Sequence, residues 1–136
     1  MNMAEKSIFT KIIEGEIPSH KIYEDDKTLA FLDIFPAVPG HTVVVPKTQV
    51  EFVWDLGDDD YQALMETTKK VARHLREKLN TKYVGTKIEG TEVPHAHVKV
   101  YPFNTVAEYN AKQDTSAEPD HTQLVEMAQK LRLEAA

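Results

Sequence analysis

Apolar residues recur with a helical period in three parts of the sequence. The first, Ser7 to Ile13, is short, and serine is a residue type that caps helices. The longest runs from about Asp59 to Leu79, with aspartates at its start and basic residues at its end, as the helix dipole favours. The third is Asp120 to Leu133. We therefore expect one short helix, one long helix and a C-terminal helix.

Five other segments have the apolar and β-branched content of strands, with turn residues between them. Because short turns join several of them, and strands and helices do not alternate strictly, the pattern favours an α+β fold with an antiparallel sheet. The polar stretch 103–119 has neither period and is expected to be irregular. The expected strands are His20–Glu24, Thr28–Asp33, Thr42–Val45, Lys82–Ile88 and His95–Tyr101, with Pro94 at the entrance of the last.

Length, charge and cysteine content exclude several classes of protein. A length of 136 residues is typical of one domain, 1–136. Lys and Arg number 16 against 22 Asp and Glu, a net charge of −6, so the chain lacks the basic surface that nucleic-acid binding requires. The absence of cysteine excludes disulfides, thiolate zinc sites and cysteine nucleophiles, and it fits a reducing cytoplasm.

No segment of the sequence has the apolarity of a targeting or membrane-spanning element. Residues 1–10 lack the apolar run of a signal peptide. The longest apolar stretch, Thr42 to Pro46, is far shorter than the roughly 20 residues that cross a bilayer. We expect a soluble cytoplasmic protein with no membrane partner.

The most informative chemistry is a pair of histidines in the last expected strand. Side chains alternate along a strand, so His95, His97 and Lys99 share one face and the apolar residues between them share the other. Three interpretations are open: a solvated polar face, a metal site, or a phosphate site in which a neutral imidazole is the nucleophile. A lysine disfavours a metal ion, but it supplies a donor for phosphate and lowers the pKa of His97.

Other candidate residues carry weaker signals. His20, His41, His74 and His121 are scattered, and we expect them to be solvated or locally hydrogen-bonded. Asp33 ends a strand before a proline-containing loop, a position more typical of a turn residue than of a ligand.

Five blocks, in this order and spacing, resemble the histidine-triad (HIT) nucleotide-binding and hydrolase family over residues 7–102, which leaves 103–136 as a C-terminal extension. The blocks are residues 8–13 with the Glu16-Ile17-Pro18 turn, Tyr23 to Asp26, Ala30 to Pro36, Pro39 to Lys47, and Val93 to His97. The resemblance implies a five-stranded antiparallel sheet with two main helices, a homodimer, and a purine nucleotide as ligand, without a cofactor.

The resemblance also assigns roles to residues. The middle histidine of the family motif attacks the α-phosphorus, which implies that His97 forms a nucleotidyl-histidine intermediate, while His95 holds the site by hydrogen bonds. The family's acidic residue at the ribose hydroxyls corresponds to Asp33. The apolar pocket for the base corresponds to Ile8, Phe9, Ile12, Phe31, Leu32 and Ile34.

The sequence departs from the family pattern at three places. The third motif histidine, which touches phosphate, is Lys99, giving a His-x-His-x-Lys motif whose extra charge favours polyphosphate substrates. Glu92 lies in the loop near the leaving group, where a carboxylate repels phosphate unless it pairs with Lys99 or is protonated. The positions through which some relatives bind structural zinc hold Ser7, Thr10 and Gln49, so no metal is expected.

The sequence therefore predicts a nucleotide hydrolase or nucleotidyl transferase that uses His97, with Lys99 as a departure that weakens or preserves activity. Dinucleoside polyphosphates, nucleoside phosphoramidates and adenylylated small molecules are the expected substrate classes. The alternatives are a dimeric nucleotide-binding protein with little or no turnover and a dimeric scaffold with a vestigial site.

Overall fold

The computed structural model describes residues 5–135; residues 1–4, at the start of the segment assessed for a signal peptide, lie outside this range. The elements follow the expected order with small shifts at their ends. The strands are β1 (Lys21–Glu24), β2 (Thr28–Leu32), β3 (Thr42–Pro46), β4 (Tyr83–Lys87) and β5 (Val98–Phe103). The helices are α1 (Ile8–Ile13), the 3-10 turn η1 (Val53–Asp55), α2 (Asp58–Leu79), α3 (Val106–Tyr109) and α4 (His121–Leu131).

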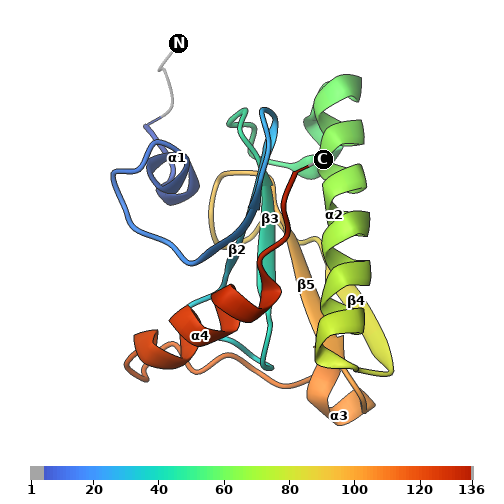
Figure 1. Cartoon of the computed structure of the whole chain (residues 1–136). Helices are drawn as coiled ribbons and strands as arrows, with labels where there is room; N and C mark the ends of the chain where they lie inside the picture. The colour runs from blue at the N-terminus through green and yellow to red at the C-terminus, as the bar shows by residue number, and fades with distance from the viewer. Residues whose placement is uncertain (1–4, 136) are drawn as a thin grey trace.

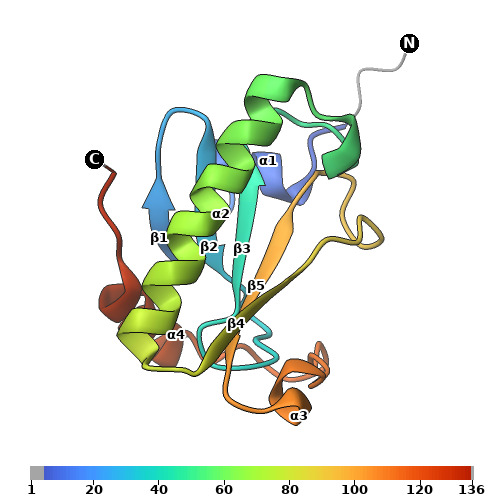
Figure 2. The same cartoon turned by 90° about the vertical axis from the view of Figure 1, so that its right-hand side faces the viewer.

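The strands form one sheet in the order β1-β2-β3-β5-β4, and every neighbouring pair is antiparallel. Helices α1 and α2 lie on opposite sides of this sheet (Figure 1), and α2 crosses one face of it at an angle (Figure 2). The α+β class, the five-stranded antiparallel sheet and the two main helices are thus confirmed.

Alternation along the strands divides the core into two clusters. The larger lies between the sheet and helices α2 and α4, and residues such as Ala30, Val44 and Val98 contribute to it. The smaller lies under α1 and is built from Phe9, Ile12, Leu29, Phe31, Val43 and Val45. A side chain two residues before or after a member of the smaller cluster on the same strand therefore faces the α1 side of the sheet.

One strand boundary differs from the prediction. The strand expected from His95 begins at Val98, and Pro94 lies in a bend before it. The amide of Ala96 donates to the carbonyl oxygen of Val50 at 2.7 Å, so this stretch bonds to a loop instead of a neighbouring strand. The alternation nevertheless continues through the bend, since Ala96 lies in the larger core cluster, on the opposite side from the two histidines.

The stretch expected to be irregular, 103–119, contains the short helix α3, which Thr105 caps by accepting a hydrogen bond from the Glu108 amide. Over residues 5–135, no helix has both the length and the apolarity needed to cross a membrane.

Candidate functional site

Strand register gathers the predicted site residues on the α1 side of the sheet. Phe31 of β2 pairs with Val43 of β3, and Val43 pairs with Lys99 of β5, which gives one row across three strands. Asp33 comes two residues after Phe31, and His41 comes two residues before Val43. The amide of Asp33 donates to the carbonyl oxygen of His41 at 3.0 Å, so the pairing of the two strands continues to these residues. Residues distant in sequence thus meet because they share strand parity and register.

His95 lies behind the site, fully buried in a polar network. Its Nε2 donates to the carbonyl oxygen of Pro46 at 2.8 Å, which leaves Nδ1 to accept from the Ser7 hydroxyl at 2.8 Å. The same hydroxyl oxygen caps helix α1 by accepting from the Thr10 amide. His95 is therefore fixed in one tautomer and tied to the start of α1.

His97 has the arrangement of a nucleophile. Its Nδ1 donates to the carbonyl oxygen of His95 at 2.8 Å, so in the neutral ring the lone pair is on Nε2. Phe9 contacts its ring edge to face, with the centroids 5.0 Å apart. Burial lowers the pKa of His97; the hydrogen bond to His95 opposes this shift and the Lys99 charge adds to it. The neutral form of the ring, with its lone pair on Nε2, is therefore favoured over the protonated form more than in a solvated histidine.

Lys99 is buried and ion-paired. Its ammonium contacts the carboxylates of Glu92 and Glu89, the latter at 3.3 Å. Burial lowers the pKa of Lys99, but the Glu92 carboxylate, with help from Glu89, raises it above the ordinary value overall. The carboxylate expected near phosphate thus pairs with the lysine, and the lysine charge is already compensated.

Asp33 lies at the end of β2 with one carboxylate oxygen bound. Its Oδ1 accepts from the Phe35 amide at 2.8 Å. Burial raises the pKa of this carboxyl, while the Phe35 amide and the Gln113 side chain act in the opposite direction. Oδ2 lies 3.7 Å from Nε2 of His41, beyond hydrogen-bond distance, and can accept a hydrogen bond from a ligand.

A cavity of about 320 Å³ joins these groups, a volume within the range of small-ligand sites. His95 is absent from its wall, consistent with its place in the layer behind. The cavity wall contains ten of the eleven residues predicted for the site: Ile8, Phe9, Ile12, Phe31, Leu32, Asp33, Ile34, Glu92, His97 and Lys99. Ten of the predicted residues thus lie around one cavity, with the apolar residues and the phosphate-binding candidates together.

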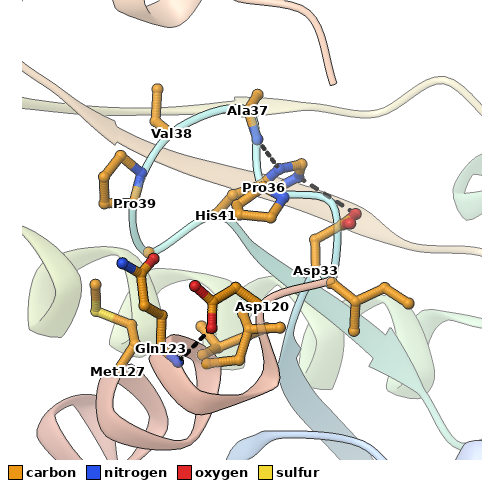
Figure 3. Close-up of a pocket in the computed structure, with 13 residues that line it drawn as sticks. Asp33, Pro36, Ala37, Val38, Pro39, His41, Asp120, Gln123 and Met127 are labelled. Atoms are coloured by element: carbon orange, nitrogen blue, oxygen red, sulfur yellow. Dashed lines mark hydrogen bonds and ion pairs between the residues drawn. The ribbon is translucent and has the colours of Figure 1, made fainter. Parts of the chain in front are cut away.

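His41 is the site residue that sequence reasoning missed. It is fully buried and locally hydrogen-bonded, the second of the two expected alternatives, and Figure 3 shows it between the Ala37 amide, which donates to its Nδ1 at 3.1 Å, and Asp33. Its Nε2 is 3.7 Å from the Asp33 carboxylate, and its ring stacks on Tyr101. Burial, aided by the Lys99 charge, lowers the pKa of His41 to about 3, so the ring is neutral. The signal that could have revealed it is its spacing. His41 is two residues from Val43, as Asp33 is from Phe31, so alternation places both on the same side of the sheet.

Figure 3 also shows a second cavity, of about 240 Å³, on the other side of Asp33. The loop 33–41 and the first turns of α4, with Asp120 and Gln123, form its wall, which includes neither His97 nor Lys99. Of these two cavities, the larger is therefore the one that combines His97 with an apolar wall.

Hydrogen bonds join the residues at the positions through which some relatives bind structural zinc. Within residues 5–135, no group of three or more His, Asp or Glu side chains is arranged to hold a metal ion. At the positions discussed for zinc, the Thr10 hydroxyl donates to Gln49 Oε1 at 2.6 Å, and the Ser7 amide donates to the same oxygen at 2.9 Å.

Comparison with known proteins gives a consistent result. The HIT domain family model matches residues 14–106. "Protein hit" of Bacillus subtilis is 41% identical over 107 residues, 75% of this chain and 74% of that protein. "Adenosine 5'-monophosphoramidase HNT1" of Saccharomyces cerevisiae is 35% identical over 96 residues, 70% of this chain and 61% of that protein.

Solved structures agree with the fold. A Hit-like protein from Bartonella henselae, crystallised with an unknown ligand, superposes with a TM-score of 0.83 at 26% identity, covering 96% of this chain and 98% of that one. A zinc-bound histidine triad family protein from Mycobacterium smegmatis gives 0.75 at 29% identity, covering 92% and 89%.

Proposed function

Because the chain belongs to the HIT domain family, we propose that it transfers the nucleotidyl group of a purine nucleotide derivative to His97 and then to water. The observation that best supports this proposal is the hydrogen bond from Nδ1–H of His97 to the carbonyl oxygen of His95, which leaves the lone pair on Nε2. His97 lies in the wall of a largely apolar cavity that also contains Asp33. A transferase that passes the group to another acceptor would use the same first step.

The cavity suggests how such a ligand lies. The purine base fits against the apolar wall formed by Ile8, Phe9, Ile12 and Phe31. The ribose hydroxyls donate to Asp33, and the α-phosphate lies between His97 and Lys99. In this arrangement the base meets an apolar wall, the sugar meets an acceptor, and the α-phosphate lies beside a lysine that is already paired with Glu92 and Glu89.

The reaction proceeds in two displacements. In the first, Nε2 of His97 bonds to the α-phosphorus, and the bond from phosphorus to the leaving group breaks with its electron pair, so the leaving atom takes a proton from solvent, which the attacking water of the second step returns. In the second, water attacks phosphorus, the bond to His97 breaks, and the nucleoside monophosphate leaves. His95 is a positioning residue, because its carbonyl oxygen accepts the Nδ1–H of His97 while positive charge develops on the ring.

The charges around Lys99 favour an amine as the leaving group. Lys99 contributes one positive charge, and Glu89 and Glu92 together contribute two negative charges at its ammonium. A polyphosphate would meet a net negative charge there, whereas an amine that gains a proton on departure would be attracted. We therefore propose nucleoside phosphoramidates as preferred substrates, rather than the polyphosphates that an unpaired lysine would favour.

Turnover on two substrates tests this function. AMP release from an adenosine phosphoramidate and from a diadenosine polyphosphate is measured for the native chain, for His97→Ala and for His121→Ala, a control at an exposed histidine. We expect turnover mainly of the phosphoramidate, its loss in His97→Ala by at least 1,000-fold, about 4 kcal/mol in activation free energy, and no change in the control.

The second candidate function is nucleotide binding with little turnover, and the compensated charge of Lys99 is the observation that favours it. AMP binding in calorimetry without turnover of either substrate would establish this function and contradict the enzyme. A homodimer, a single domain over 1–136 and a cytoplasmic location stay predictions, which analytical ultracentrifugation, limited proteolysis and cell fractionation test.

A further inference from the structure

The segment between α3 and α4 forms part of the cavity wall. It leaves α3 at Asn110 and reaches the α4 cap at Asp120, and Figure 1 shows it running along the lower end of the sheet. Two of its residues, Gln113 and Thr115, line the same cavity as His97 and Lys99.

The start of this segment is anchored to the sheet. Before it, the Tyr109 hydroxyl donates to the carbonyl oxygen of Thr86 at 2.9 Å, and Lys87 donates to the carbonyl oxygen of Tyr109 at 3.4 Å. Within it, Asp114 accepts from the hydroxyl and the amide of Ser116. The segment thus starts from a point fixed on β4 and contains a local turn at Asp114.

Gln113 is the residue that reaches the sugar-binding candidate. Its Nε2 donates to the carbonyl oxygen of Phe35 at 2.8 Å, and Phe35 is the residue whose amide binds Asp33. Gln113 is half-buried in a stretch whose other polar side chains are exposed. Its amide group is therefore fixed beside Asp33, and its Oε1 is left to accept a further hydrogen bond.

From this geometry, and resting on the proposed function, we propose that Gln113 is a second sugar-binding residue, which reads the ribose diol together with Asp33. A ribose presents two hydroxyl donors, and the pair presents two acceptors, Oδ2 of Asp33 and Oε1 of Gln113. A glutamine also avoids the repulsion that a second carboxylate at position 113 would create beside Asp33. The C-terminal extension thereby sets specificity for ribonucleotides at a site built mainly by residues 8–99.

Two ligands separate a sugar contact from a general effect on the pocket. Calorimetry measures the affinity of AMP and of 2′,3′-dideoxyadenosine monophosphate, which has neither hydroxyl, for the native chain and for Gln113→Ala. We expect Gln113→Ala to weaken AMP binding about five- to tenfold, the loss of one hydrogen bond, and to leave the dideoxy ligand unchanged. Gln129→Ala, at an exposed glutamine of α4, is the matched control and should change neither affinity.

The outcomes distinguish the proposal from the function on which it rests. Equal weakening of both ligands, or no weakening of AMP, overturns the role of Gln113 while the nucleotide function stands. If the native chain binds neither ligand, both proposals fail. Urea unfolding of Gln113→Ala should show a loss of no more than about 1.5 kcal/mol, the hydrogen bond to Phe35; a larger loss would show that Gln113 holds the fold rather than the ribose.

Discussion

The buried, neutral His41 makes the stability of the protein sensitive to acid. In the unfolded chain this histidine has its ordinary pKa of 6.5, whereas in the fold it is about 3. Below pH 6.5 the unfolded state therefore binds one more proton than the folded state, and stability falls as pH falls toward 3. Above pH 6.5 both states are neutral and this group has no effect.

The size of the effect follows from the shift. Each pH unit below 6.5 lowers the free energy of unfolding by up to about 1.4 kcal/mol, so at pH 5 the loss from His41 is about 2 kcal/mol. In His41→Asn the amide oxygen can still accept from the Ala37 amide, but no group titrates there. The variant loses the stacking on Tyr101 and starts less stable at pH 7, by roughly 1–3 kcal/mol.

Urea unfolding at pH 7 and pH 5, followed by circular dichroism, measures the difference in free energy of unfolding between the native chain and the variant at each pH. The gap between the native chain and His41→Asn should shrink by about 2 kcal/mol at pH 5, because the other buried histidines titrate in both proteins and cancel. Gln129→Ala, at an exposed residue of α4 that carries no titratable group, should show the same difference in stability at both pH values. A gap for His41→Asn that is the same at both pH values would refute the burial of a neutral imidazole.

Three further results are expected. Lys99→Gln removes a positive charge that lowers the pKa of His97, so the acid limb of kcat/KM for a phosphoramidate should move to higher pH; an unmoved limb would contradict the coupling. Ser7→Ala leaves a buried imidazole nitrogen without its donor and should lower the free energy of unfolding by about 1–3 kcal/mol in urea titrations, and no loss would argue against the network. Gly40 has a φ of +87°, and a Cβ there would lie 2.5 Å from Leu79 Cδ1, so Gly40→Ala should lower the melting temperature by several degrees, roughly 1–3 kcal/mol, and an unchanged value would refute the close packing.

Local patterns predicted most of the fold, because they are local physical preferences. The long helix α2 follows from its apolar stripe and its charged ends, and the observed Asp58–Leu79 differs from the prediction by one residue. The start of β5 could not be predicted in this way. It is set by a bond from Ala96 to Val50, a contact between loops that no periodicity encodes.

The site divides in the same manner. Alternation correctly separated His97 and Lys99 from the apolar side of β5, and the resemblance supplied Asp33, which its local sequence alone did not favour. Gln113 could not be found, because its segment carries no apolar period and reaches the cavity only through tertiary folding. Of the two carboxylates on Lys99, Glu92 was foreseen as a possible partner and Glu89 was not.

The central claim, a nucleotidyl intermediate on His97, is tested most directly by the stereochemistry at phosphorus. An adenosine thiophosphoramidate of one configuration at phosphorus is hydrolysed in isotopically labelled water, and the configuration of the product is determined. Two successive displacements, first by His97 Nε2 and then by water, predict overall retention. Inversion would show that water attacks phosphorus directly, and it would contradict the role assigned to His97.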